Sequence, residues 1–296
     1  MRAVGLCACG CGVFFGQAGS AVAGDCAKGP AGEPKLSTKR IGTLAWARET
    51  GGRLHPSQRH AVHREMLKAQ ARCLADLSRP AREAIAGMDL DAVRIPDSAL
   101  AKAAEKYVSA LSSGALMNHL YRTYYWGTLL AQADKARIKD EELFYVAALL
   151  HDLGITKQHR CTDSNVVDFS VDGGFAAYDF LVAQGVTKQR AEAAAEAIIL
   201  HMQIVGEDFG AMAKYLQQGA WTDLSGLRAS EIPAQLARGV IEKQPALDIR
   251  KEFGAFVVEE ITTRPDTRLA VSVQAAQELK GGAPLFPWPD RPERIG

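Results

Sequence analysis

The amino-acid sequence predicts an all-α fold on three grounds. From about residue 95 to residue 275, apolar residues recur at the spacing of one helix face. Capping residues and glycines separate these segments, as expected at helix ends. Apolar and polar residues alternate as in a β-strand only in the short stretch 166–171. We therefore predict a helical bundle that follows a poorly structured N-terminal extension.

The first four helices are placed by their start signals and their apolar faces. Pro56 opens the first, which we expect over 56–77. An Asp-Ser pair suited to N-capping precedes the second, expected over 98–111. The next two are expected over 115–133 and 141–151, and both carry apolar residues on the faces that turn inward.

The remaining helices follow from the same kinds of signal. An aspartate before a Gly-Gly pair begins the helix expected over 172–182, and Gly185 ends it. A threonine suited to N-capping begins the helix expected over 187–201. Three more helices complete the series, and they are expected over 206–218, 233–243 and 248–263.

These elements divide the chain into four parts. The main part is a helical domain, preceded by an extension with one helix and followed by a proline-containing irregular tail. The first residues resemble a secretory signal peptide, because the small residues Ala21-Val22-Ala23 end a moderately apolar stretch. The four parts are 1–24 for the signal-like segment, 25–92 for the extension, 93–275 for the helical domain and 276–296 for the tail.

The N-terminal segment leaves the cellular location open. Removal of residues 1–23 would make the protein exported or periplasmic, whereas a retained segment would leave it cytoplasmic. The C-x-C-x-C pattern of Cys7, Cys9 and Cys11 is interpreted as small apolar residues within this segment. Six cysteines in 296 residues are too few and too scattered for a disulfide scaffold.

Composition excludes two classes of partner. A formal net charge of +1 gives no reason to expect nucleic acid as a partner. No apolar stretch in the body of the chain approaches the roughly 20 residues of a membrane helix. A small-molecule substrate is therefore the expected partner. A homo-oligomer is compatible with the sequence, which does not fix the oligomeric state.

The residues that suggest chemistry lie at the end of the helix expected over 141–151. His151 and Asp152 follow a run of apolar residues directly, so both groups are expected to be buried. Burial of such a pair costs several kcal/mol unless a partner compensates it. A divalent metal ion is a suitable partner, because it binds neutral imidazole and ionised carboxylate together.

Other helices supply further candidate ligands. His119 and His201 each lie on the inward face of a different helix, as judged from the apolar residues one turn away. A single histidine in this position is more often a satisfied core residue than a ligand. Three such histidines, one of them next to Asp152, indicate a metal site instead. Asp223, which follows an apolar tryptophan, is the expected fourth ligand beside His119, His151 and Asp152.

The ligand types suggest the chemistry of the site. Two histidines with two carboxylates accept several divalent metals; we expect zinc first, with iron or manganese as alternatives. Such an ion lowers the pKa of bound water toward about 7 and so supplies a nucleophile at neutral pH. His201, just outside the ligands, is expected to orient the substrate or move the proton. His201 and Asp152 are therefore the predicted catalytic residues.

Five segments of the chain also carry a family resemblance. They are Ile95–Ser98, Asn118-His119, Leu143–Gly154, Phe169–Gly173 and Ala197–His201. In this order, and with Asp223 after them, they resemble the HD superfamily of metal-dependent hydrolases, and within it the cyanamide hydratase-like proteins. The resemblance covers residues 93–225 well and residues 1–92 hardly at all.

The resemblance implies an HD-type helical bundle in which His119, His151, Asp152 and Asp223 bind the metal. It places His201 near the substrate, and it implies addition of water to a nitrile carbon, as in the conversion of cyanamide to urea. The chain departs from the family at Ser170, where relatives tend to have glutamate. It also departs at 202–205, where relatives often have threonines and a proline. Both departures lie near the expected pocket, so the resemblance predicts the metal better than the substrate.

Two other functions remain open from the sequence. A phosphohydrolase acting on nucleotides would need cations for phosphate, and Lys157 and Arg160 are the predicted substrate-binding residues in that case, with His159 and Arg122 as further candidates. The alternative reading of these residues is a solvated loop and helix face. A non-catalytic HD-like signalling module is the other function, and the complete set of predicted ligands counts against it.

Overall fold

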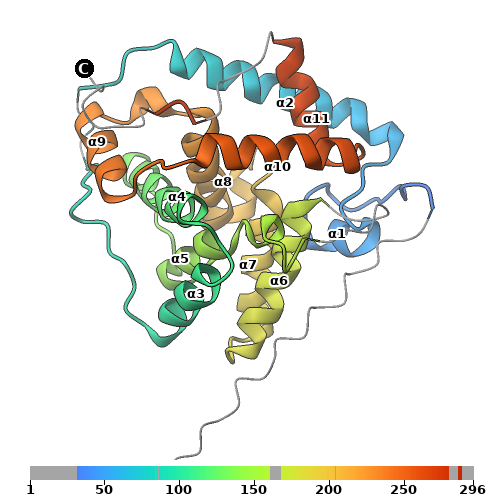
Figure 1. The fold of residues 1–296 in the computed structure, drawn as a ribbon, viewed down its shortest axis with the longest axis horizontal. Coiled ribbons are helices and arrows are strands. Elements are labelled where there is room, and N and C mark those ends of the chain that lie inside the picture. Colours follow the sequence, from blue (N-terminus) through green and yellow to red (C-terminus); the bar gives the residue numbers. More distant parts are fainter. Residues whose placement is uncertain are drawn as a thin grey trace, which may run out of the picture.

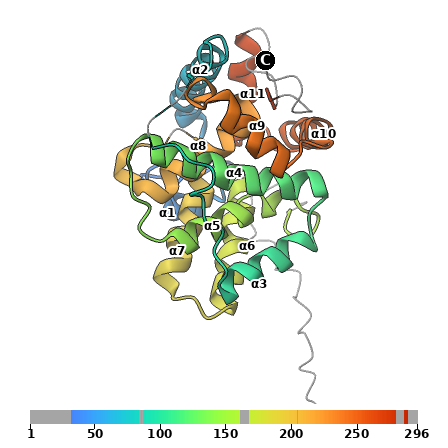
Figure 2. The ribbon, with the colours of Figure 1, turned by 90° about the vertical axis from the view of Figure 1, so that its left-hand side faces the viewer.

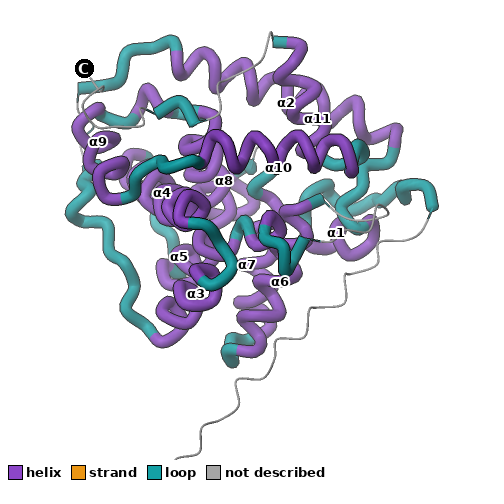
Figure 3. The backbone as a smooth tube through the Cα atoms, viewed as in Figure 1, coloured by secondary structure: helices purple, strands orange, loops and turns teal. Residues whose placement is uncertain are grey.

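A computed structural model describes residues 32–83, 85, 87–160, 168–203, 205–279 and 286–288 of the chain. Within these ranges all regular structure is helical, and no strand occurs (Figure 3), which confirms the predicted all-α fold. The predictions for the signal-like segment 1–24 and its cysteines lie outside the described residues. The strand-like stretch is helical from Phe169 onward.

Eleven α-helices and three short 3-10 helices make up the described part of the chain. They are α1 (Leu44–Thr50), α2 (Pro56–Leu77), α3 (Ala99–Ser109), α4 (Gly114–Ala133), α5 (Glu141–Leu150), η1 (Leu153–Ile155), α6 (Phe169–Ala183), α7 (Lys188–Leu200), η2 (Glu207–Phe209), α8 (Gly210–Ser225), η3 (Ala229–Glu231), α9 (Ala234–Lys243), α10 (Ile249–Thr263) and α11 (Arg268–Glu278).

Several helix boundaries differ from those predicted, each for a local reason. Helix α6 begins three residues earlier than expected, because the Asp168 carboxylate accepts a hydrogen bond from the backbone N–H of Ser170 and caps the helix. Helix α8 continues to Ser225, where Gly226 adopts a left-handed conformation and ends it. The part of the extension that the structure describes contains two helices, α1 and α2, where one was expected.

Helix α5 lies at the centre of the main core. It packs against α3, α4, α6, α7 and α8. Its eight residues from Leu143 to Leu150 are each at most 1% exposed.

Helices α4 and α8 pack closely against each other. A Cβ atom on Gly219 would lie 2.2 Å from the carbonyl oxygen of Thr123, so only glycine fits there. This contact brings the helices that carry His119 and Asp223 side by side.

A second apolar cluster joins α1 and α2, near the start of the described chain, and α11, near its end, to this core. Helices α2 and α11 pack against each other along one side of the molecule, as two perpendicular views show (Figures 1 and 2). Trp46, Cys73 and Ala275 are fully buried there, together with Ile199 of α7. The extension and the last helix therefore belong to the folded body and cover one face of the core.

No helix in the described part of the chain combines the length and the hydrophobicity that crossing a membrane would need.

Candidate metal centre

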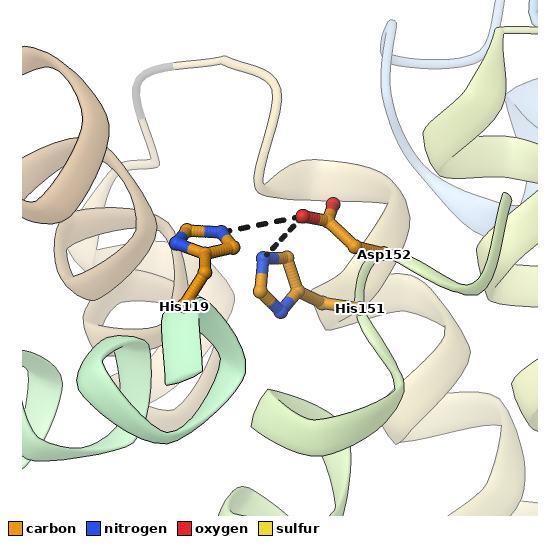
Figure 4. A group of neighbouring side chains, drawn as sticks. All are labelled: His119, His151 and Asp152. Atoms are coloured by element: carbon orange, nitrogen blue, oxygen red, sulfur yellow. Dashed lines mark ion pairs between the residues drawn. The ribbon is translucent and has the colours of Figure 1, made fainter. Parts of the chain in front are cut away.

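His119, His151 and Asp152 meet in the interior of the molecule (Figure 4). His119 comes from α4, His151 ends α5, and Asp152 precedes η1. The Oδ2 atom of Asp152 lies 3.2 Å from His119 Nε2 and 3.3 Å from His151 Nε2. One ligand atom from each residue falls within 4.8 Å of the other two, and all three side chains are buried. The predicted convergence of these three residues is therefore present.

Two glycines fix the turn that carries His151 and Asp152. A Cβ atom on Gly154 would lie 1.9 Å from the carbonyl oxygen of Phe169. A Cβ atom on Gly173 would lie 2.9 Å from the carbonyl oxygen of His151. Any larger residue at either position would push η1 away from the start of α6. Gly154, which lies in η1, thus holds the His-Asp pair against the start of α6.

The hydrogen bonds of the nearby histidines determine which ring nitrogen carries the proton. In all three rings Nδ1 faces an oxygen that can only accept, so Nδ1 is the donor and Nε2 keeps its lone pair. The acceptors are Asp223 Oδ2 for His119 at 2.8 Å, the Ala148 carbonyl for His151 at 2.8 Å and the Ile198 carbonyl for His201 at 2.5 Å. Three Nε2 atoms are therefore available as metal ligands.

The atoms at the centre of this group lack hydrogen-bond partners. His119 Nε2, His151 Nε2 and both carboxylate oxygens of Asp152 are buried without one. Orphaned polar atoms are rare in protein interiors, and here four of them belong to three neighbouring side chains. Because lone pairs and negative charge face one another, a cation is the partner that would satisfy all of them. The donor set fits a divalent metal ion.

Burial and charge set the protonation states of these groups. Burial lowers the pKa of His151 to about 3 and also lowers the pKa of His201, so both rings are neutral at neutral pH. Burial alone would raise the pKa of Asp152, but His151 and His119 beside it lower it. Burial would lower the pKa of His119, but Asp152 and Asp223 together raise it. A metal ion would replace the proton that this position attracts.

Asp223 lies on the opposite side of the His119 ring from Asp152. Its Oδ2 binds His119 Nδ1, and the Arg122 guanidinium contacts both of its oxygens, Oδ1 at 2.8 Å and Oδ2 at 3.0 Å. Trp126 Nε1 also donates to Oδ1, at 2.7 Å. Burial would raise the Asp223 pKa, but the Arg122 charge and His119 lower it to about 2. In this geometry Asp223 is placed to orient His119 and lies outside the group of His119, His151 and Asp152, and its role as a fourth ligand stays a prediction.

We therefore expect Asp223→Asn to weaken metal binding without removing a ligand. The amide can still accept from His119 Nδ1, but it loses the charge that makes His119 Nε2 a stronger ligand. Such changes behind a ligand typically lower metal affinity about 10–100-fold. Competition with a chromophoric chelator would measure the change, with the exposed Asp208→Asn as control. An affinity equal to that of the wild type would contradict this role.

His201 lies beside the group, as predicted. Its Nε2 is 3.8 Å from Asp152 Oδ1, and its ring stands edge-on to the His151 ring at a centroid distance of 5.0 Å. The indole Nε1 of Trp221 donates to the His201 carbonyl at 2.8 Å, which fixes the end of α7. The free Nε2 of His201 is thus held next to the carboxylate of Asp152.

A cavity of about 340 Å³ opens onto these residues. His119, His151, Asp152 and His201 form one part of its wall. Neither Lys157 nor Arg160, the predicted substrate residues, lines it. Lys157 is exposed, and Arg160 forms ion pairs with Glu259 and Glu260. Arg122 is fully buried against Asp223, so it does not face a ligand either.

Sequence reasoning missed the rest of the pocket wall. Gln70 of α2, Phe253 of α10 and Ser272 of α11 line the cavity. A signal was present for Gln70, because it falls on the same helix face as Met66 and Cys73 at i, i+4 and i+7 spacing. A glutamine on an apolar stripe is a reason to look for a binding site. Helices α10 and α11 carry no comparable mark.

Fold and site together describe an all-helical protein with a buried His-His-Asp group that could hold a metal ion. Within the described ranges, this is the single group of three or more such side chains found close enough to share one.

Two known proteins are similar to this chain in sequence. The chain is 26% identical to cyanamide hydratase DDI2 of Saccharomyces cerevisiae over 174 residues, which cover 57% of this chain and 76% of the yeast protein. Cyanamide hydratase DDI3 of the same yeast aligns with equal identity and coverage. No family model matches the chain. The similarity confirms, at the level of the family, the cyanamide hydratase-like resemblance of the sequence motifs.

Proposed function

We propose that this protein is a metal-dependent hydratase of the HD superfamily that adds water to a carbon–nitrogen triple bond. The observation that carries the proposal is the convergence of His119 Nε2, His151 Nε2 and the Asp152 carboxylate without hydrogen-bond partners. The similarity to two yeast cyanamide hydratases supports this reaction type over others.

The residues divide the work of the reaction. His119, His151 and Asp152 would hold the metal, with zinc as the first expectation. The bound ion would supply Lewis acidity and a water of lowered pKa. His201 Nε2 would carry the proton toward the nitrile nitrogen. One water adds across the triple bond, its oxygen bonding to carbon and its two hydrogens ending on nitrogen, so a nitrile becomes an amide and cyanamide becomes urea.

The walls of the pocket argue against phosphate-ester hydrolysis. Among the described residues that line it, none is lysine or arginine. A nucleotide phosphate carries negative charge and needs cations or several N–H donors. Beyond the bound ion itself, the described lining residues offer no cation for the remaining phosphate charge. We therefore place phosphohydrolase activity second and a non-catalytic module third.

A paired substrate screen tests the proposal. Protein loaded with zinc, manganese or iron would be incubated with cyanamide and small nitriles, and in parallel with a panel of nucleoside phosphates. We expect urea or amide release that disappears after chelation and returns when the metal is restored. Phosphate release without any amide would overturn the proposal in favour of a phosphohydrolase. Undiminished activity after complete metal removal would also contradict it.

A further inference from the structure

The cavity is much larger than cyanamide requires. Its volume of about 340 Å³ equals the space of roughly ten water molecules at about 30 Å³ each. Cyanamide is a short linear molecule not much larger than two waters. A substrate that filled only the part next to Asp152 would leave most of the cavity occupied by solvent. The size of the cavity therefore indicates a larger molecule.

The wall chemistry defines the class of that molecule. Beyond the metal group and His201, the cavity is lined mainly by apolar side chains, among them Phe169, Trp221, Phe253 and Leu269. Each of these four is at most 9% exposed. Asp152 is the one carboxylate among the described lining residues, and no lysine or arginine lines the cavity beside it. Such walls favour an uncharged hydrocarbon body and disfavour charged groups.

Three uncharged polar side chains interrupt the apolar wall, Gln70, Ser225 and Ser272, and two of them contact each other. Gln70 of α2 and Ser272 of α11 line the cavity and are only 8% and 6% exposed. Gln70 Nε2 donates to Ser272 Oγ over 3.3 Å, which is a long hydrogen bond. A hydroxyl or carbonyl group of a ligand could replace this weak bond with a shorter one. The pair therefore forms a second polar contact point, separate from the metal group.

We propose that the pocket selects neutral organic nitriles with a hydrocarbon body larger than cyanamide, and that Gln70 and Ser272 bind a polar group on that body. This inference rests on the proposed hydratase function, because it assigns the substrate of the same site. The nitrile group lies at the end of the cavity formed by Asp152 and His201. One water adds to it there, and the product that leaves is the primary amide.

Chain length provides the direct test. Calorimetric titration and turnover would be measured with metal-loaded protein for cyanamide, acetonitrile, butyronitrile and hexanenitrile, with cyanoacetate as the charged comparison. Transfer of hydrocarbon into the cavity should tighten binding about fourfold per added methylene. Cyanoacetate should bind most weakly. Equal affinity along the series, or a preference for cyanamide, would overturn the inference.

Gly254 of α10 offers a variant that narrows the cavity. It lines the pocket, and a Cβ atom added there would meet no other atom within 4 Å. Leucine is also the better helix former, so Gly254→Leu should fold. We expect about a tenfold loss of hexanenitrile affinity, as for the removal of between one and two methylenes, with acetonitrile unchanged. Ala255→Leu on the exposed face of the same helix is the matched control.

A second variant tests the polar contact point. Gln70→Leu should weaken binding of 6-hydroxyhexanenitrile and leave hexanenitrile binding equal or tighter. An equal loss for both compounds would overturn the role of Gln70.

The two proposals fail in different ways. Turnover of cyanamide but of no larger nitrile would support the hydratase function and would contradict the inference of a larger substrate. Binding that strengthens with chain length, without amide formation from any nitrile, would support the selectivity of the pocket and would overturn the reaction.

Discussion

Asp152→Ala is expected to abolish bound metal and activity together. Among the described residues, Asp152 alone directs a carboxylate at the centre of the group, since the Asp223 carboxylate is turned toward Arg122. The two remaining imidazoles, His119 and His151, would bind a divalent ion weakly. We expect metal affinity to fall by more than about 100-fold, beyond the range seen for residues behind a ligand. Elemental analysis after dialysis and an activity assay would check both.

The fold should survive this change, which makes the test decisive. Neither carboxylate oxygen of Asp152 accepts a hydrogen bond in the described part of the chain, so the variant loses no bond that holds a helix. Far-UV circular dichroism and urea unfolding of the metal-free forms should therefore be close to wild type. His151→Ala should also lose metal and activity. A folded Asp152→Ala protein with full metal content would contradict the assigned centre.

The sequence predicted the fold and the centre of this site because their signals are local. The apolar run before His151 identified α5 as buried, and a buried His-Asp pair calls for a cation wherever it occurs. The inward direction of His119 and His201 followed from helix periodicity alone. Each of these inferences needs only the identity of neighbours within two helix turns.

The parts that the sequence did not predict depend on contacts between distant segments. Asp223 was correctly placed in the core near His119. The side of the His119 ring on which it lies depends on Arg122, which is 101 positions earlier in the chain and donates hydrogen bonds to both carboxylate oxygens. Arg160 was expected at the substrate, yet its partner Glu260 lies 100 positions later. Gln70 and Ser272 meet across 202 positions. Periodicity carries no information about such pairings.

Arg268→Met is expected to destabilise the protein by about 3–5 kcal/mol, the range for breaking a buried ion pair from one side. Arg268 is fully buried at the start of α11, and its Nε binds the equally buried Asp168 at 2.9 Å. Its other nitrogens bind Ser170 Oγ at 2.7 Å and the Ile199 carbonyl at 2.8 Å. The single guanidinium thus joins α11 to the start of α6 and the end of α7. Urea unfolding at pH 7 would measure the loss.

Two further measurements separate the ion pair from general packing. Asp168→Asn combined with Arg268→Met should be more stable than Arg268→Met alone, because no buried charge is left without a partner. Arg48→Met, which breaks an exposed ion pair with Glu192, should change stability by no more than about 1 kcal/mol. A double variant as unstable as the sum of its parts would show that packing alone explains the loss.

The pH dependence gives the sign of the effect independently. Burial would raise the pKa of Asp168, but Arg268 and Ser170 lower it below its value in the unfolded chain. In the wild type the Asp168–Arg268 ion pair therefore stabilises the fold at pH values above the unfolded pKa. This stabilisation is lost as the pH falls through the folded pKa. In Arg268→Met the guanidinium is gone and burial still disfavours the charged form of Asp168. The pKa of Asp168 in the folded variant therefore lies above its pKa in the unfolded chain. Protonation then stabilises the variant while it destabilises the wild type. The difference between their unfolding free energies should therefore shrink from pH 7 to pH 4, and a constant difference would refute the assignment.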